Sequence, residues 1–385
     1  MKTTVTLILC FFTTLQMFAQ VKKTTYKSTL LGETRDLQFY IPEDYDAEKK
    51  YPLIIVLDAD YLFDLVVATV KFNSYNDLMP KSIVVGVNQG TKNFRELDCD
   101  YSDDDGLPQD KGSLFFEFIG REIVSLVEMN YNLAEFKAVV GHGITANFIN
   151  YYLLKADPLF DGYICLSPTL APQITERIAD RLSTFKERKL YYLANAKRNL
   201  DQEDKARISA LNDILKSIEN PKLYYYYNDF ENATDYTVAS YGIPEAFDLF
   251  YDIYEPISKE EYDANIVNYE GPVIEYLIKK QEAIKELFGF EKPIPLNDIM
   301  AIYSAIKKGE YRDLESLEKL AEIAKEAYPD TMLGFFFLAE FYEQSGEPKK
   351  ALKTYENAFT MPEIDFLTKD LMLDRIAALK EDFGF

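Results

Sequence analysis

The strongest constraint on the fold is a regular alternation of short apolar runs with segments of helical periodicity. The run Tyr51–Leu57 is almost entirely apolar and ends in Asp58-Ala59-Asp60, which is the pattern of a strand covered on both faces. Further strand-like runs are 26–31, 36–41, 82–87, 137–141, 162–166, 189–194 and 222–227, and helix-like segments are 62–72, 113–128, 146–155, 173–185 and 205–218. Strands that alternate with helices predict an α/β fold with a doubly wound, mostly parallel sheet. Ligands of such sheets bind at the carboxyl ends of the strands.

The strand pattern stops near residue 255, and the rest of the chain is predominantly helical. We therefore expect an α/β domain over 24–255, a linker or helical connection over 256–295 and a small all-α domain over 296–385. Tetratricopeptide (TPR) spacing is visible within the last part, at Leu338, Ala339, Tyr342, Gly346, Ala351, Tyr355 and Ala358. Ala321, Ala324 and Pro329 would end a preceding repeat. The TPR-like helices either bind a protein or peptide partner or simply cap the first domain.

Charge and the amino terminus limit the possible partners and location. The formal net charge of -22 argues against binding to nucleic acid or to an anionic membrane surface. Residues 1–19 have the pattern of a signal peptide, with Lys2, an apolar stretch over 5–12 and a polar exit, and the stretch is too short to span a bilayer. We expect an exported protein, periplasmic or secreted, in which Cys99 and Cys165 either pair or stay as buried thiols.

A strand–turn–helix motif marks the place where the chemistry of such a fold is expected. The strand at 137–141 runs into His142-Gly143-Ile144-Thr145 and a helix, which is the context of the nucleophile elbow G-x-S-x-G. Gly143 stands at the serine position and Thr145 at the last glycine. Because Gly143 has no side chain, it cannot attack an acyl carbon. The Thr145 hydroxyl is expected to bond to the local backbone.

The chain contains one histidine, His142, directly beside the nucleophile position. A catalytic base must approach the nucleophile from a separate loop. His142 is therefore expected to pack and hydrogen-bond under the elbow.

Over about residues 26–254 the chain resembles the bacterial esterases of the esterase D and ferric-enterobactin esterase type. The matching segments, in order, are Leu31-Gly32-Glu33-Thr34-Arg35, Tyr40-Ile41-Pro42, Tyr51-Pro52, Leu57-Asp58, Val84-Val85-Gly86-Val87 with Arg95 and Asp98, Gly141-His142, Phe160-Asp161-Gly162-Tyr163 and Ser167-Pro168. The resemblance implies an α/β-hydrolase fold and a family that cleaves acyl and siderophore esters.

The resemblance also implies where the remaining catalytic groups should be. The histidine of the family falls at Asp235, in the loop 231–238, so the base is replaced together with the nucleophile. The family's acid follows the strand at 190–194, where the first carboxylate is Asp201, and we assign no residue to it.

Several residues remain as the outer wall of the former pocket. The oxyanion region and its surroundings are expected at Asp58, Ala59, Asp60, Arg95, Asp98, His142 and Ile144. Arg95 and Asp98 either form a salt bridge that shapes their loop or contact a ligand. The acids Asp58, Asp60, Asp98, Asp100 and Asp103-Asp104-Asp105 could collect a cation, but without EF-hand spacing we expect solvated loop acids, no metal and no cofactor.

The leading hypothesis is an exported pseudo-hydrolase that acts as a binding or scaffolding protein. Its former cleft would take a small molecule or a glycan, and its helices a protein or peptide. The run Tyr224–Tyr227 could line a sugar cleft or pack within a sheet. One alternative is an ester hydrolase whose base is a carboxylate among Asp60, Asp98 and Asp235. Another is a peptide-binding adaptor that works through the helices alone.

Overall fold

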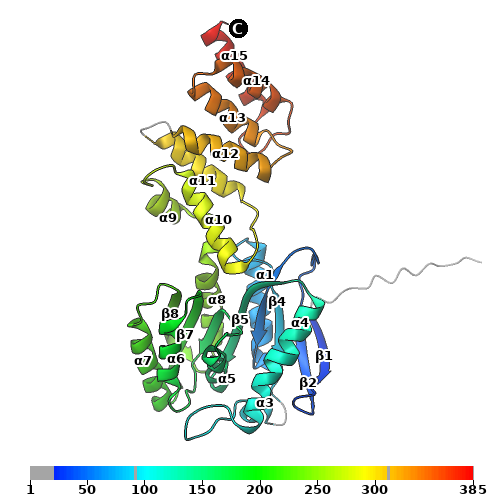
Figure 1. The fold of residues 1–385 in the computed structure, drawn as a ribbon, viewed down its shortest axis with the longest axis vertical. Coiled ribbons are helices and arrows are strands. Elements are labelled where there is room, and N and C mark those ends of the chain that lie inside the picture. Colours follow the sequence, from blue (N-terminus) through cyan, green and yellow to red (C-terminus); the bar gives the residue numbers. More distant parts are fainter. Residues whose placement is uncertain (1–20, 91–92, 310–312, 385) are drawn as a thin grey trace, which may run out of the picture.

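An eight-stranded sheet forms the centre of the first domain in the computed structural model, which describes residues 21–90, 93–309 and 313–384 (Figure 1). The predicted signal peptide lies outside these residues. The strands are β1 (Val21–Lys27), β2 (Thr34–Tyr40), β3 (Tyr51–Val56), β4 (Ile83–Val87), β5 (Leu133–His142), β6 (Gly162–Leu166), β7 (Lys189–Arg198) and β8 (Leu223–Thr234), in the spatial order β1-β2-β4-β3-β5-β6-β7-β8. β1 and β2 are antiparallel to their neighbours and the other pairs are parallel. This confirms the predicted α/β-hydrolase fold.

Alternate residues of each central strand supply two separate cores. Leu53 and Ile55 of β3 belong to one, and Ile54 and Val56 to the other. The first core is covered by α3 (Asp110–Phe118), η1 (Ile119–Val124), α4 (Ser125–Asn130), α5 (Ile144–Phe148), η2 (Ile149–Leu154), α6 (Ile174–Thr184) and α7 (Gln202–Lys216). The second is covered by α1 (Ala59–Tyr75), α8 (Val238–Tyr251) and α10 (Ile274–Phe288). Burial on both faces explains why the β3 run is continuous rather than alternating.

Several elements differ from their predicted bounds. The strand expected over 26–31 ends at Lys27, because residues 28–33 form a turn in which Ser28 N–H donates to the Glu33 carbonyl at 2.9 Å and Gly32 has a positive φ of 65°. A short helix, α2 (Phe94–Asp98), interrupts the loop expected over 88–110. β8 continues seven residues beyond Tyr227, to Thr234. Cys99 and Cys165 are both buried free thiols.

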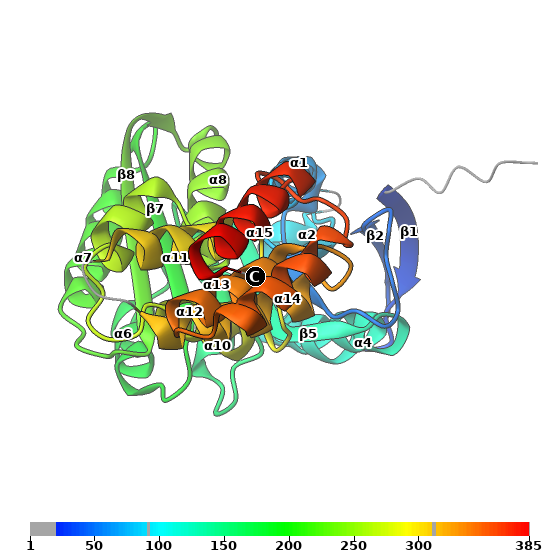
Figure 2. The ribbon, with the colours of Figure 1, turned by 90° about the horizontal axis from the view of Figure 1, so that it is seen from above.

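The described part of the chain after the α/β domain is mainly helical and rises from that domain (Figure 1; Figure 2 looks down on it). After η3 (Asp252–Tyr254) it contains α9 (Lys259–Glu261), η4 (Tyr262–Ile266), α10, α11 (Leu296–Lys308), α12 (Leu314–Ala327), α13 (Leu333–Gln344), α14 (Pro348–Phe359) and α15 (Lys369–Phe383). The predicted TPR positions fall on α13 and α14, with Gly346 in the turn at φ 76°. Among the described residues, no helix is both long and apolar enough to cross a membrane.

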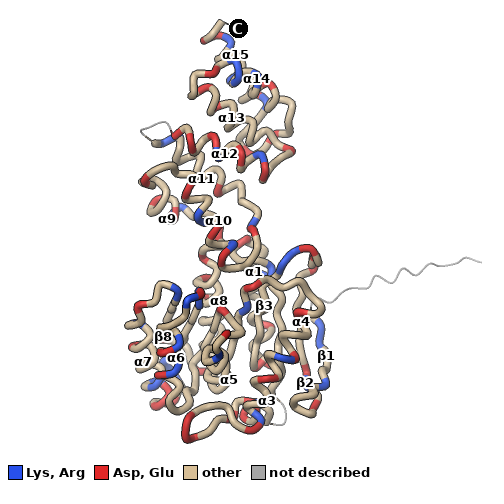
Figure 3. The backbone as a smooth tube through the Cα atoms, viewed as in Figure 1, with Lys and Arg blue, Asp and Glu red and all other residues tan. Residues whose placement is uncertain are grey.

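Helix α10 joins the two parts because it packs into both of them. Ile274 and Leu277, near its start, belong to the core of the helical extension. Ile284 and Phe288, near its end, belong to the second core of the α/β domain. The segment expected as a connection is therefore a shared structural element. Acidic residues are spread over both parts (Figure 3), so the net charge does not gather at one surface.

A buried ion pair holds α2 against the start of the sheet. Arg35 of β2 and Asp98 of α2 are both fully buried and form two hydrogen bonds, of which Nη1 to Oδ2 is 2.7 Å long. Gln89 Nε2 donates to the same carboxylate at 3.0 Å, and the Arg35 guanidinium lies 4.0 Å from the Phe94 ring centroid.

We predict that Arg35→Met lowers the free energy of unfolding by roughly 3–5 kcal/mol, because the Asp98 carboxylate would lose its buried counter-charge. Urea denaturation followed by circular dichroism measures the change. Arg121→Met, at an arginine whose side chain is 70% exposed, is the matched control and should change stability by less than about 0.5 kcal/mol. Equal effects of the two substitutions would contradict the assignment.

Candidate functional site

The elbow at Gly143 keeps the backbone geometry that a nucleophile would need. β5 ends at His142, Gly143 has φ 58° and ψ -118°, and α5 starts at Ile144. The Gly143 N–H donates to the Leu166 carbonyl at 2.9 Å, and the Gly143 carbonyl accepts from Thr169 N–H at 3.1 Å. A Cβ on Gly141 would lie 2.6 Å from the Thr145 carbonyl oxygen, so the turn requires glycine there.

Arg95 crowds the position that a nucleophile's side chain would take at Gly143. A Cβ built on Gly143 would lie 3.2 Å from Arg95 Nη2. That nitrogen donates to the His142 carbonyl at 2.8 Å and to Asp58 Oδ2 at 3.1 Å, while Nε donates to Asp58 Oδ1 at 2.7 Å. Burial opposes the charge on Arg95, but the hydrogen bonds and charge of Asp58 outweigh it and raise the pKa of Arg95 above its ordinary value. The guanidinium is thus charged and fixed by three hydrogen bonds.

Both ring nitrogens of His142 already have partners. Nδ1 lies 2.9 Å from the Tyr61 hydroxyl, and Nε2 lies 2.8 Å from the Asp235 carbonyl oxygen and 3.3 Å from its Oδ1. The Tyr61 hydroxyl donates to Asp58 Oδ2 at 3.0 Å. Burial, followed by the charge of Asp58, raises the pKa of Tyr61 far above its ordinary value, so this hydroxyl remains protonated.

The Thr145 hydroxyl is fully buried beneath the elbow. It accepts from His142 N–H at 2.8 Å and lies 2.8 Å from Asp58 Oδ2, to which it donates. The local backbone bond expected from the sequence is present, with Asp58 as an additional partner. This arrangement leaves the hydroxyl no access to a ligand.

The salt bridge considered between Arg95 and Asp98 is not formed, and that interpretation was wrong. Arg95 pairs with Asp58, whereas Asp98 turns into the core and pairs with Arg35. The two side chains leave α2 in different directions because one is partly exposed and the other fully buried.

Asp60 also faces away from the elbow. Its Oδ2 accepts from Gln89 N–H and Gly90 N–H, each at 2.7 Å, and so holds the loop after β4. Ala59 is buried, and its carbonyl accepts from Gln38 Nε2 at 3.0 Å. Of the three carboxylates considered as a base, Asp60, Asp98 and Asp235, Asp235 alone lines the cleft above the elbow.

That cleft has a volume of about 570 Å³ and opens at the carboxyl ends of the parallel strands. Its lining consists of Tyr61, Arg95, His142, Gly143, Ile144, Thr169, Asn199, Leu200, Asp201, Asp204, Asp235 and Tyr236. The structure thus brings together five sequence-predicted positions, namely Arg95, His142, Gly143, Ile144 and Asp235.

Asp204 is a cleft residue that the sequence analysis missed. Burial raises the pKa of Asp204, and the charges of Asp201 and Asp235 raise it further against the hydrogen bond from Thr169. Asp201 caps α7 by accepting from Glu203 N–H at 2.7 Å. A signal in the sequence could have identified Asp204. It is the capping residue Asp201, which is followed three residues later by a second aspartate at the start of the helix after β7.

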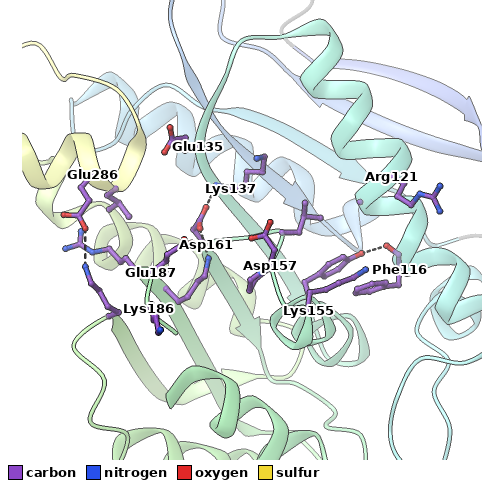
Figure 4. Close-up of a pocket in the computed structure, with 18 of the residues that line it drawn as sticks. Phe116, Arg121, Glu135, Lys137, Lys155, Asp157, Asp161, Lys186, Glu187 and Glu286 are labelled. Atoms are coloured by element: carbon purple, nitrogen blue, oxygen red, sulfur yellow. Dashed lines mark hydrogen bonds and ion pairs between the residues drawn. The ribbon is translucent and has the colours of Figure 1, made fainter. Parts of the chain in front are cut away.

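A second cleft, of about 620 Å³, lies at the amino ends of the parallel strands, where α10 joins the α/β domain (Figure 4). Its charges are partly paired: Lys189 with Asp161 at 2.8 Å, and Lys222 with Glu286 of α10 at 3.3 Å. The helical extension and the elbow cleft therefore stand at opposite ends of the parallel strands. Tyr224–Tyr227 lie on β8, half-buried against the two sheet cores, and do not line the elbow cleft.

We predict that Gly143→Ala costs roughly 1–3 kcal/mol of stability, because an L side chain is strained at φ 58° and its Cβ would approach Arg95. Gly32→Ala is the control, since Gly32 also has a positive φ but open space around it. Thermal unfolding of both variants measures the difference. A loss at Gly143 no larger than that at Gly32 would show that Arg95 does not crowd the position.

Comparisons with known proteins agree with the fold described above. The family described as "Putative esterase" matches residues 28–218, which include the elbow. A solved structure of an uncharacterised protein from Capnocytophaga ochracea is 34% identical, with a TM-score of 0.85, and the match covers 94% of this chain and all of that one. The helical extension is thus part of a shared architecture. No curated protein matches the chain.

More distant structures share the fold alone. An IroE-like serine hydrolase from Shewanella oneidensis is 21% identical with a TM-score of 0.57, over 78% of this chain and 98% of that one. The siderophore hydrolase EstB from Aspergillus nidulans is 15% identical with a TM-score of 0.51, over 65% and 97%.

Proposed function

We propose that this chain, which belongs to the "Putative esterase" family of α/β-hydrolases, is an exported binding protein that has lost ester hydrolysis and keeps the cleft. The proposal of export rests on the signal pattern of residues 1–19. The loss of hydrolysis rests on the elbow.

One observation carries the proposal: Gly143 has no side chain, and the Arg95 guanidinium crowds the position that a nucleophile's side chain would take. Acyl transfer needs a nucleophile with a base in hydrogen-bond reach and room for the acyl carbon beside it. Gly143 supplies no nucleophile. Arg95 Nη2, 3.2 Å from the Cβ position of Gly143, crowds the space that the acyl carbon would need. A cation bonded to Asp58 and to the His142 carbonyl is held too firmly to be displaced by a neutral ester.

Of the carboxylates considered as a base, only Asp235 lines the cleft above the elbow. A base that activates water needs a free oxygen above the elbow. Asp235 has its carbonyl and one carboxylate oxygen next to His142 Nε2, and Asp60 and Asp98 bond elsewhere.

The helical extension is proposed as the surface for a protein or peptide partner. Phe366 and Leu373, near and on the last described helix, expose 39% and 48% of their surface. Apolar side chains on the last helix of a stack of helices leave an unfinished face for a further element. The extension joins the domain at the amino ends of the strands, and the cleft opens at their carboxyl ends. A partner on the extension and a ligand in the cleft can therefore be bound together.

We predict that the purified mature chain hydrolyses p-nitrophenyl acetate and butyrate at the rate of a buffer blank. Asp235→Asn is the matched variant: it should be indistinguishable from the wild type if the cleft is inert. Hydrolysis that copurifies with the protein and falls on Asp235→Asn substitution would instead establish the carboxylate-base mechanism.

A further inference from the structure

We propose that the cleft above Gly143 binds a small zwitterion, with the ligand's carboxylate at Arg95 and its ammonium group at Asp204. The inference rests on the proposed function, because it takes the cleft as a binding site and names the class of ligand. It is carried by the opposite charges of two residues, Arg95 and Asp204, that line the same cleft.

Arg95 provides the positive side. Its side chain is 29% exposed, although Nε and Nη2 are committed to Asp58 and the His142 carbonyl. Nη1 takes no part in these bonds. A guanidinium is a planar fork whose remaining N–H groups suit a carboxylate oxygen. Because Asp58 is 1% exposed and does not line the cleft, a ligand can approach Arg95 without competing for Asp58.

Asp204 provides the negative side. Its Oδ2 accepts from the Thr169 hydroxyl at 3.2 Å, and no ion pair involves it among the described residues. Its nearest candidate cation, Arg207, instead bonds to Glu203 and to the Leu170 carbonyl. Burial, with the repulsion of Asp201 and Asp235, raises the pKa of Asp204 against the hydrogen bond from Thr169 and the charge of Arg207. An ammonium group at this place would supply a counter-charge.

Arg95 lies next to Gly143, and Asp204 is linked to Gly143 through Thr169. Arg95 Nη2 is 3.2 Å from the Cβ position of Gly143, and Thr169, the partner of Asp204, donates its N–H to the Gly143 carbonyl at 3.1 Å. The cleft's 570 Å³ is ample for a molecule of amino-acid size. Tyr61 and Tyr236, with exposed rings, also line the cleft, and such rings favour an ammonium group or an alkyl chain.

The charge pattern disfavours ligands that carry a single charge. A plain carboxylate would meet Arg95 but be repelled by Asp201, Asp204 and Asp235. A plain amine would meet these acids and leave Arg95 without a ligand group. A dipolar ligand satisfies both sides at once.

Isothermal titration calorimetry of the mature chain with a length series of ω-amino acids, from glycine to 6-aminohexanoate, tests the proposal. Because Arg95 and Asp204 are held on two helices, α2 and α7, of the same domain, one chain length should bind most tightly. The n-alkylamine and the n-alkanoate of that length should each bind at least about tenfold more weakly, because each loses one charge-assisted hydrogen bond.

Asp204→Asn should also weaken the best ω-amino acid by about tenfold, while Asp213→Asn, an exposed acid on the same helix, should leave binding unchanged. Absence of binding across the series, equal binding of the plain amine, or equal effects of the two substitutions would overturn the proposal. Such results with no ester hydrolysis would leave the proposed function intact, whereas hydrolysis by the wild type would refute the proposed function itself.

Discussion

The buried carboxylate of Asp58 is the group on which the cleft depends. Asp58 follows β3 with a left-handed backbone, φ 52° and ψ 36°, so that its side chain turns beneath the elbow. There it accepts from Arg95, from the Tyr61 hydroxyl and from the Thr145 hydroxyl. One carboxylate thereby ties the start of α1, the helix α2 and the elbow together.

A buried carboxylate needs a partner of opposite charge, and here the partner comes from α2. Arg95 satisfies it and in doing so crowds the position beside Gly143. The same bond explains two features of the protein: why the elbow keeps its shape without a nucleophile, and why the cleft presents a cation at its floor. The carboxylates of Asp201, Asp204 and Asp235 then give the opposite wall its negative charge. The need of the buried Asp58 carboxylate for a counter-charge thus places the positive charge of the cleft at Arg95.

Much of the fold could be predicted because it depends on patterns that the sequence shows directly. The run at β3 is apolar at successive positions because both faces of the strand are covered, and the elbow is recognisable from a strand, a tight turn and a helix in succession. The α13–α14 pair follows from small residues at repeat spacing. Of the bounds that were missed, the turn at 28–33 is closed by the local bond between Ser28 and Glu33, whereas α2 depends on the contact of Asp98 with the distant Arg35.

The charged partners of the site could not be predicted for the same reason. Arg95 and Asp98 lie three residues apart, which suggested a pair, yet each finds its partner at a distance of 37 or 63 residues along the chain. Asp204 enters the cleft only because the cap at Asp201 fixes the first turn of α7. Identity and spacing mark such residues as candidates, and only the fold decides their partners.

The most direct measurement of the central claim is the rate at which a fluorophosphonate labels a serine restored to the elbow, followed by intact mass. Gly143→Ser with Asp235→His is compared with the same pair of substitutions plus Arg95→Lys, in which an ammonium still faces Asp58 but the branched guanidinium is gone. If Arg95 crowds the nucleophile's position, labelling is at least about tenfold faster with lysine. Equal rates in the two proteins would contradict the account.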